Sequence, residues 1–402
     1  MQFNAIEDRH IRAHYRSMNT TLIIQTVRSG PFTFQLGIDP AGLALAQVRV
    51  QDAWEMFQAS PLAAAANQLQ REVLVLSVFG TNTIEGADLT EEETSRSLDL
   101  DPKRVQAQQD IRVRNIKAAY DLAVRSSEGP DWVLSIDYIR AVHAEICRDL
   151  PHPDNRPGLF RDNPRERPTV VGNAEHGGVY RPPQLGRDIS TLMDALVKWH
   201  NALVAEGVSP WVRAPLVHLY YEMIHPFWDG NGRVGRVLEA TLLRQSGFRY
   251  APFALAKFYQ EQIHEYFTLF NRCRKAADKH QHAPNQQFVA FHLEGLRVVI
   301  VRLHQRVAEI SQRLIFETVA RVRYEEKELN QRQYGIVRFV LDSGAPLSIS
   351  ALRADPRYQA MYASKTDKTR QRDLKNLLGT GLVVLDKAGH LRPIFAADKC
   401  PK

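Results

Sequence analysis

The sequence predicts a mainly α fold: a helix bundle that contains a small β-hairpin, followed by a smaller C-terminal domain of helices and a further hairpin. Apolar residues recur at the spacing of amphipathic helices in long runs that cover most of the chain. Segments with the composition of strands are short and bounded by glycine or proline. A length of 402 residues leaves room for two or three domains, each with its own core.

The first hundred residues predict an extended arm followed by helices. Residues 21–27 and 32–36 are rich in β-branched and aromatic side chains and flank a Ser-Gly-Pro turn, which predicts a small hairpin. Residues 41–100 have helical spacing, interrupted at Ser60-Pro61. Thr90 and the glutamate three residues later form a capping box that opens another helix.

The central part of the chain predicts a bundle of amphipathic helices, because extended segments are scarce there. Pro215 suits the first turn of one of these helices. The expected helices cover residues 105–124, 136–148, 185–205, 214–224, 234–246, 260–277 and 287–323.

One segment inside the bundle predicts strands. Residues 168–172 and 177–183 carry β-branched residues bounded by glycine and proline, and four polar or small residues join them. On composition alone this is an ordinary surface hairpin.

The C-terminal region predicts a winged helix. A charged stretch at 321–328 reads as a solvated helix end or a linker. Lys368, Arg370, Arg372 and Lys375 make the third helix basic, so DNA phosphates are one expected partner. A winged helix used for dimerisation or packing is the equal alternative. The expected elements are helices over 330–341, 348–352 and 366–378 and a hairpin over 381–386 and 389–393.

Composition and charge set only coarse limits on the partners and the cellular compartment of this protein. The net charge of +7 and the pI near 9.3 fit contact with nucleotides or nucleic acid but also fit many other proteins. Cys147, Cys273 and Cys400 are far apart, which disfavours a disulfide framework or a zinc–cysteine site. We found no signal peptide and no apolar run long enough for a bilayer, so the expectation is a cytoplasmic protein without a membrane partner.

Residues 225–236 carry the densest chemistry. His225 is a candidate general base, because imidazole titrates near neutral pH. Asp229 offers the hard oxygen ligands that Mg²⁺ prefers. The turn at 230–232 has the glycines that let backbone N–H groups point at phosphate oxygens. Arg233 and Arg236 are three apart, which places two guanidinium groups on one face of a helix.

The same stretch contains a misleading pattern. Residues 230–235 satisfy G-x-G-x-x-G, but that pattern indicates a dinucleotide site only after a strand and with an acidic residue about 20 positions later. Here a helical segment precedes it, and residues 250–257 contain no carboxylate. A Walker-type phosphate loop is also absent from the sequence.

Taken whole, residues 225–236 resemble the Fic family signature, HPFx(D/E)GNGRxxR, at every specified position. The resemblance implies an all-helical fold that transfers AMP from ATP to a protein hydroxyl. His225 would deprotonate the hydroxyl and Asp229 would bind Mg²⁺. The hairpin at 168–183 would be the flap that holds the target peptide as an added strand. The residues expected around ATP are Glu85, Val171, Gly172, Asp229, Gly230, Asn231, Gly232, Arg233, Val234, Gly235, Arg236 and Tyr266.

Tyr266 and His218 also have plainer interpretations. The resemblance puts Tyr266 near the adenine ring, whereas a core aromatic residue is an equal alternative. His218 is expected to be a packing residue, because the sequence places no third ligand for a metal beside it.

A second motif lies upstream. Thr81, Glu85 and Gly86 match the family's inhibitory motif, (S/T)xxxE(G/N), on a helix of about residues 62–86 that precedes the core. Without that resemblance Glu85 is a solvated carboxylate near a helix end, where Gly86 is a plausible terminating residue. With it, Glu85 would pair with Arg236 and take the place of the ATP γ-phosphate.

Together these features predict an autoinhibited protein adenylyltransferase that modifies a Ser, Thr or Tyr hydroxyl of a target protein, and possibly of itself, using ATP and Mg²⁺. The expected divisions are an N-terminal region 1–104, a core 105–325 and a winged helix 326–402. Expected partners are a target protein at the flap, DNA through 366–392 and a second copy in a homodimer. The alternatives are the reverse reaction, transfer of another phosphate-linked group, and a DNA-binding regulator that only senses nucleotide.

Overall fold

The computed structural model describes residues 21–101, 105–129 and 131–396. The chain divides into two compact units. The first ends at His304, and the second comprises Pro61–Ala65 and everything from Gln305 onward. Helix α12 (Gln286–Glu325) therefore begins in the first unit and ends in the second.

The first unit opens with the expected hairpin. Strands β1 (Leu22–Gln25) and β2 (Pro31–Phe34) pair antiparallel. Helices α2 (Pro40–Gln58) and α3 (Leu62–Ile84) follow, separated at Ser60-Pro61 as predicted. The capping box of α4 (Glu91–Leu98) is present as well, so the local signals of this region are confirmed.

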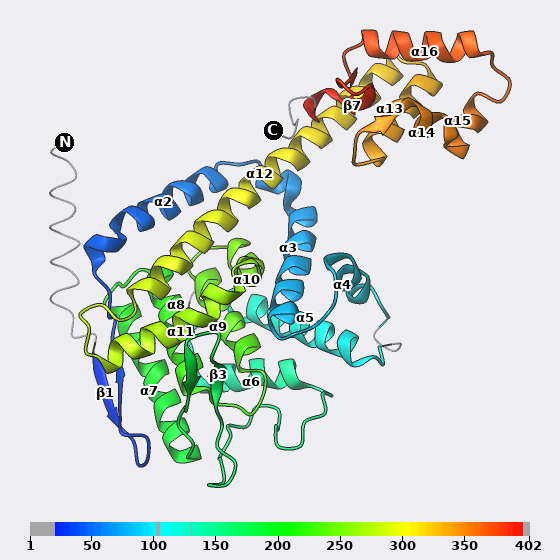
Figure 1. The fold of residues 1–402 in the computed structure, drawn as a ribbon. Helices are drawn as coiled ribbons and strands as arrows, with labels where there is room; N and C mark the ends of the chain where they lie inside the picture. Colours follow the sequence, from blue (N-terminus) through cyan, green and yellow to red (C-terminus); the bar gives the residue numbers. More distant parts are fainter. Residues whose placement is uncertain (1–20, 102–104, 130, 397–402) are drawn as a thin grey trace, which may run out of the picture. The chain divides into compact units, whose positions relative to one another are not determined.

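Helices α8 (Pro210–Ile224) and α9 (Asn231–Gln245) form the centre of the bundle, and nearly all of their residues are buried. Helix α9 contains the second half of the predicted signature and also contacts α5 (Gln108–Ser126), α6 (Ile136–Cys147) and α10 (Ala251–Glu261), so this part of the signature is supported on several sides (Figure 1). The other helices of the bundle are α7 (Gly186–Ala205) and α11 (Ile263–Asp278).

Two helix predictions were wrong. Pro215 lies inside α8, because Pro210 takes the first-turn position instead. The helix expected at 260–277 is split at Gln262, and α10 precedes the break. Helix α10 is buried on almost every side, so it lacks the one-sided apolar pattern that identifies an amphipathic helix.

The predicted flap is a hairpin of β3 (Val171–Asn173) and β4 (Gly178–Tyr180), with Val171 opposite Tyr180. Gly172 has a φ of +87°, and a Cβ there would lie 2.7 Å from the carbonyl oxygen of Gly178. Only glycine accommodates both the left-handed backbone and this close approach. The hairpin therefore has a defined, tight geometry.

The second unit has one strand and one helix more than predicted. The expected second helix ends at Ala354, and Pro356 starts a further short helix capped by Asp355. Asp373 is buried between Arg332 and Tyr362 and fixes the last helix to the first. The order of elements is consistent with the winged-helix expectation. They are α13 (Gln331–Asp342), β5 (Leu347–Ser348), α14 (Ile349–Ala354), α15 (Pro356–Met361), α16 (Asp367–Gly379), β6 (Val383–Leu385), β7 (His390–Pro393) and a 3₁₀ turn η2 (Ile394–Ala396), with sheet order β5-β7-β6.

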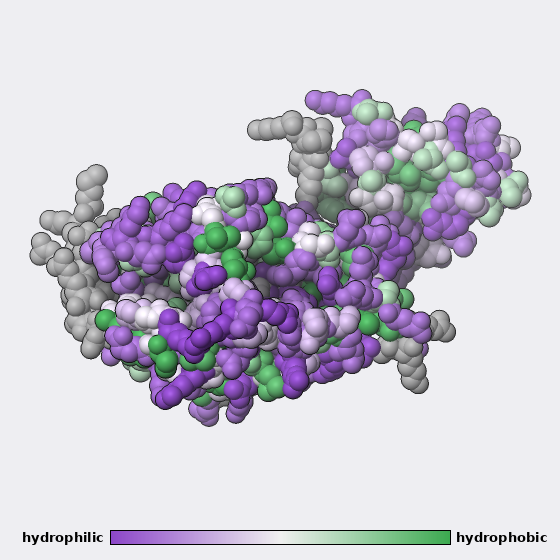
Figure 2. All heavy atoms as spheres, turned by 60° about the horizontal axis from the view of Figure 1, so that its bottom comes forward, coloured by the Kyte–Doolittle hydropathy of each residue, from purple (hydrophilic) through white to green (hydrophobic). Residues whose placement is uncertain are grey.

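In the described part of the chain, no helix combines the length and apolarity that a bilayer crossing requires. Hydrophilic residues cover most of the face shown in Figure 2, and hydrophobic residues form small separate groups on it.

Candidate active site

The candidate site is built around the loop between α8 and α9. His225 ends α8 in a left-handed conformation, with φ +51°. The fully buried Arg161 holds this turn: its Nε donates to the carbonyl of His225 at 2.7 Å, and its backbone N–H donates to that of Pro226 at 2.9 Å. Burial lowers the pKa of Arg161 to about 10. The sequence analysis missed Arg161, because it lies far from the loop in a segment without regular structure.

Asn231 braces the same loop from inside. Its side chain accepts from the backbone N–H of Phe227 at 3.0 Å and donates to the carbonyl of Phe227 at 2.8 Å. Phe227 is buried and stacks on the ring of His143, with centroids 3.6 Å apart. Asn231 therefore shapes the loop.

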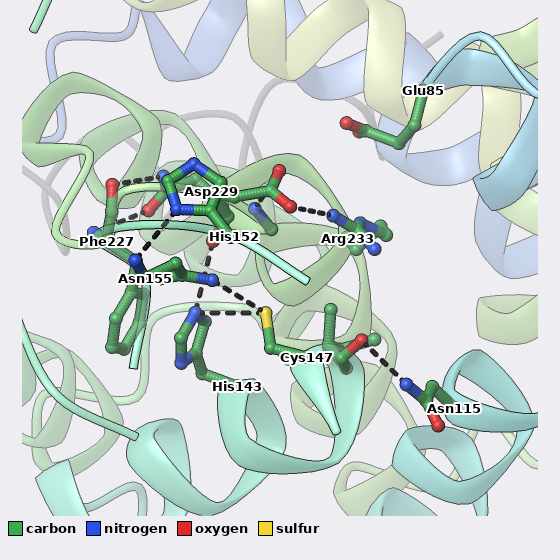
Figure 3. A network of polar contacts seen from close by, with 12 residues as sticks. Glu85, Asn115, His143, Cys147, His152, Asn155, Phe227, Asp229 and Arg233 are labelled. Carbon is green, nitrogen blue, oxygen red and sulfur yellow. Dashed lines mark hydrogen bonds and ion pairs between the residues drawn. The ribbon is translucent and has the colours of Figure 1, made fainter. Parts of the chain in front are cut away.

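A polar cluster supports the loop from behind (Figure 3). His143 Nδ1 accepts from the N–H of Gly158 at 2.8 Å, so in neutral His143 the proton is on Nε2, which lies 3.1 Å from the carbonyl of Asp229. Burial lowers the pKa of His143 to about 4, so the ring is neutral near pH 7. Gly230 has a φ of +83°, and a Cβ there would lie 3.1 Å from the sulfur of Cys147. The turn thus fits closely against α6.

Asp229 forms an ion pair with Arg233 at 2.9 Å and accepts from the N–H of Gly230 at 2.7 Å. Partial burial acts to raise the pKa of Asp229, but the Arg233 charge and these hydrogen bonds lower it below its usual value. Its side chain is 41% exposed, so the carboxylate remains accessible. Nε and Nη1 of the buried Arg233 meet no hydrogen-bond acceptor among the described residues.

A cavity of about 340 Å³ lies beside the loop, within the size range of small-molecule sites. Seven predicted site residues line it: Glu85, Val171, Gly172, His225, Gly232, Arg236 and Tyr266. The predicted residues outside the cavity wall are Thr81, Gly86, Asp229, Gly230, Asn231, Arg233, Val234 and Gly235. The wall also contains residues that the sequence analysis did not single out for this site, including His176, Tyr180, Glu222, Phe270, Asn271 and Arg274.

The expected pair between Glu85 and Arg236 is present. Glu85 Oε1 lies 2.6 Å from Arg236 Nη2, and the Arg236 side chain is only 2% exposed. Arg236 also donates to the carbonyl of Thr81 at 3.3 Å. A Cβ on Gly232 would lie 2.5 Å from Glu85 Oε1, so the pair needs glycine at this position. Gly86 has a φ of +82°, as expected for the residue that ends α3.

His225 faces a carboxylate that the sequence analysis missed. Its Nδ1 lies 3.4 Å from Oε2 of Glu222 but without hydrogen-bond geometry. A Cβ on Gly235 would lie 2.6 Å from Oε1 of Glu222, so this glycine makes room for that side chain. A carboxylate on a largely apolar helix, three residues before a candidate base, was the available signal.

Tyr266 belongs to a buried polar network. Its hydroxyl lies 3.4 Å from Arg236 Nη1 and 3.0 Å from Nε2 of His218. Nδ1 of His218 lies 3.2 Å from Glu239, which also accepts from the hydroxyl of Tyr259 at 2.9 Å. His218 is therefore buried as expected, but among polar partners. The Tyr266 hydroxyl turns toward Arg236, and its ring is nearly fully buried.

Residues 133–243 match the model of the Fic/DOC family. Protein adenylyltransferase Fic of Drosophila ananassae is 27% identical over 212 residues, which are 52% of this chain and 39% of the fly protein. Protein adenylyltransferase fic-1 of Caenorhabditis elegans is 28% identical over 199 residues, 50% of this chain and 37% of the worm protein. The chain thus spans about two fifths of the length of these relatives.

Two solved structures share the fold. A Fic family protein from Desulfovibrio desulfuricans G20 has a TM-score of 0.56 at 18% identity and covers 91% of this chain and 98% of its own. Fic-1 of C. elegans has a TM-score of 0.52 at 21% identity, covering 67% of this chain and 75% of the solved chain. The expected mainly helical Fic fold is confirmed.

Proposed function

We propose that this chain, whose residues 133–243 match the Fic/DOC family model, is a protein adenylyltransferase that is held inactive by Glu85. The observation that carries the proposal is the ion pair between Glu85 and Arg236 in the cavity that His225 also lines. It joins an inhibitory carboxylate, a phosphate-binding guanidinium and a candidate base in one site.

In the proposed reaction, His225 accepts the proton of a target hydroxyl. Its Nδ1 faces Glu222, so Nε2 is the nitrogen left for this proton. The hydroxyl oxygen then attacks the α-phosphorus of ATP, a new phosphorus–oxygen bond forms, and the bond to the bridging oxygen breaks. Pyrophosphate leaves, and AMP stays on the protein. Arg233 and Arg236 would neutralise the charge on the leaving group.

Asp229 fits the Mg²⁺ that such a reaction uses. Its carboxylate is ionised, accessible and held by Gly230 and Arg233. Mg²⁺ commonly takes one or two protein carboxylates and completes its shell with phosphates and water. When bound, the ion would neutralise phosphate charge and orient the polyphosphate.

The proposed inhibition is a competition for Arg236. A γ-phosphate and the Glu85 carboxylate are both anions that would use the Nη2 donor now occupied at 2.6 Å. With Glu85 in place, ATP would lack its terminal clamp and its α-phosphorus would be misplaced relative to His225. A 1 Å error in placement costs about 100-fold in rate.

Labelled ATP tests the proposal on wild type and Glu85→Ala. We expect label from the α-phosphate, but none from the γ-phosphate, to appear on protein with the variant. Glu91→Gln is a matched control, because it removes a different glutamate carboxylate. Glu91 lies on α4 and forms a surface ion pair with Lys257 of α10 at 2.7 Å. Label lost from pre-modified protein would support the reverse reaction instead, and no transfer either way would support a nucleotide sensor.

The target would bind along the flap, residues 168–183, by strand addition. Val170 and Val179 expose apolar side chains there, 49% and 62% accessible. A peptide held mainly through its backbone brings its hydroxyl toward His225 with little demand on sequence. Alanine at both valines should weaken modification of a target in trans more than ATP binding.

DNA binding is a second proposed activity. Lys368, Arg372 and Lys375 are exposed along one stripe of α16, whereas Arg370 is engaged with Asp367 at 3.1 Å. Alanine at the three exposed positions should abolish a salt-dependent mobility shift with duplex DNA. Arg370→Ala is the control, and absence of any shift at low salt would remove this proposal.

A further inference from the structure

The turn of the flap faces the first turn of α11 through three metal-binding side chains. Nε2 of His176 lies 3.2 Å from Nδ1 of His264, which in turn lies 3.1 Å from Oε1 of Glu175. All three donor atoms lie within 4.8 Å of one another. We propose that Glu175, His176 and His264 bind a divalent transition-metal ion of the Zn²⁺ class.

Two of the three distances between the donor atoms match a tetrahedral ion. Ligands about 2.0–2.1 Å from Zn²⁺ lie about 3.3 Å from one another when they occupy corners of a tetrahedron. The two measured edges, 3.2 and 3.1 Å, are within 0.2 Å of that value. Two imidazoles and one carboxylate form a ligand set common in protein zinc sites. Small side-chain movements would therefore suffice for coordination.

Hydrogen bonding alone satisfies this cluster poorly. Nδ1 of His264 lies close to both Nε2 of His176 and Oε1 of Glu175. One imidazole nitrogen carries a single proton or a single lone pair, so it can direct a well-aligned bond to only one of these neighbours. A cation in the centre would accept a lone pair from all three groups.

The backbone on both sides is already ordered. Asn173 Oδ1 accepts from the N–H of His176 at 2.9 Å, and Asn271 Nδ2 donates to the carbonyl of His176 at 3.0 Å. On α11, Thr268 donates to the carbonyl of His264 at 2.6 Å. The ligands are therefore presented by structured segments, which reduces the entropy lost on binding.

The ion would tie the flap to α11 at the edge of the active-site cavity, because His176 lines that cavity. The side chains of Glu175 and His264 are 63% and 75% exposed, so a fourth coordination position would be open to water. This site differs chemically from Asp229: two imidazoles favour Zn²⁺, Ni²⁺ or Cu²⁺ over Mg²⁺.

Zinc binding to the full chain tests the site without relying on AMP transfer. We expect ZnCl₂ titration calorimetry to show one saturable site, weakened about 10-fold or more by His176→Ala, His264→Ala or Glu175→Gln. His282→Ala removes another exposed histidine and should leave affinity unchanged. No saturable site, unchanged affinity in all three ligand variants, or an equal loss in His282→Ala would overturn the assignment.

A second measurement tests whether the bound ion holds the flap against α11. Zn²⁺ should slow amide hydrogen exchange in residues 172–178 of wild type but not of His264→Ala, because only the complete site joins the flap to α11. If exchange in wild type stays unchanged at saturating Zn²⁺, the ion does not join the flap to α11. MgCl₂ at the same concentration should have no effect on these amides.

Discussion

Arg233 and Arg236 lie one turn apart on α9, and each forms an ion pair with a carboxylate. The partner of Arg233 is Asp229, four residues earlier in the same segment. The partner of Arg236 is Glu85, at the end of a separate helix. The local pair is built into the loop, whereas the distant pair depends on how α3 is seated against α9. A switch can therefore act on Arg236 without disturbing the side of the loop that we propose to bind Mg²⁺.

The largest expected effect is on the rate of AMP transfer, which should change in opposite directions when the two carboxylates are replaced. Glu85→Ala should raise the initial rate of AMP transfer by about 100-fold, because it frees Arg236 to donate to the transition state, and one such donor changes the rate by about that factor. Asp229→Ala in that background should lower it by about 100-fold, because the Mg²⁺ ligand is lost. The comparison would break if both substitutions changed the rate of label incorporation in the same direction.

The second expected effect concerns stability. Glu85→Ala leaves the buried Arg236 without its carboxylate and should lower the free energy of unfolding of the first unit by about 3 kcal/mol. Mg–ATP at 100 times its dissociation constant should raise the free energy of unfolding by about 2.7 kcal/mol, because it binds only the folded protein. Thermal melts with and without nucleotide measure this, and a larger ATP shift in wild type than in the variant would argue against competition for Arg236.

A smaller effect is expected on the local side of the loop. Gly230→Ala should cost about 2 kcal/mol, because alanine strains the left-handed backbone and its Cβ would lie 3.1 Å from Cys147. Gly389→Ala is a matched control with a similar φ of +78° and open space around it. It should cost about 1 kcal/mol. Equal losses in urea unfolding would show that α6 does not constrain the turn.

The last expected effect is a pH dependence from His143. Its pKa falls from 6.5 to about 4 on folding, so between these values the unfolded chain binds more protons and stability rises with pH. That contribution is complete above pH 6.5 and is lost as the pH falls toward 4. His143→Gln should reduce the slope of unfolding free energy against pH by at most about 1.4 kcal/mol per unit. An unchanged slope would contradict the buried neutral ring.

Motifs with contiguous residues were predictable, and contacts between distant segments were not. The hairpins, the capping box at Thr90 and the loop at 225–236 follow from local spacing. The Glu85–Arg236 pair was expected only because two short motifs resembled those of one family. Arg161 and His143 support His225 and Asp229 from segments whose sequence shows no special pattern. Tertiary packing alone brings them to the loop.

The most direct test is a double-mutant cycle on the rate of AMP transfer, with wild type, Glu85→Ala, Arg236→Ala and the combined variant. If Glu85 inhibits by occupying Arg236, its removal should raise the rate about 100-fold when Arg236 is present and leave the rate unchanged when Arg236 is alanine. An equal rise in both backgrounds would show that Glu85 acts by another route and would contradict the account.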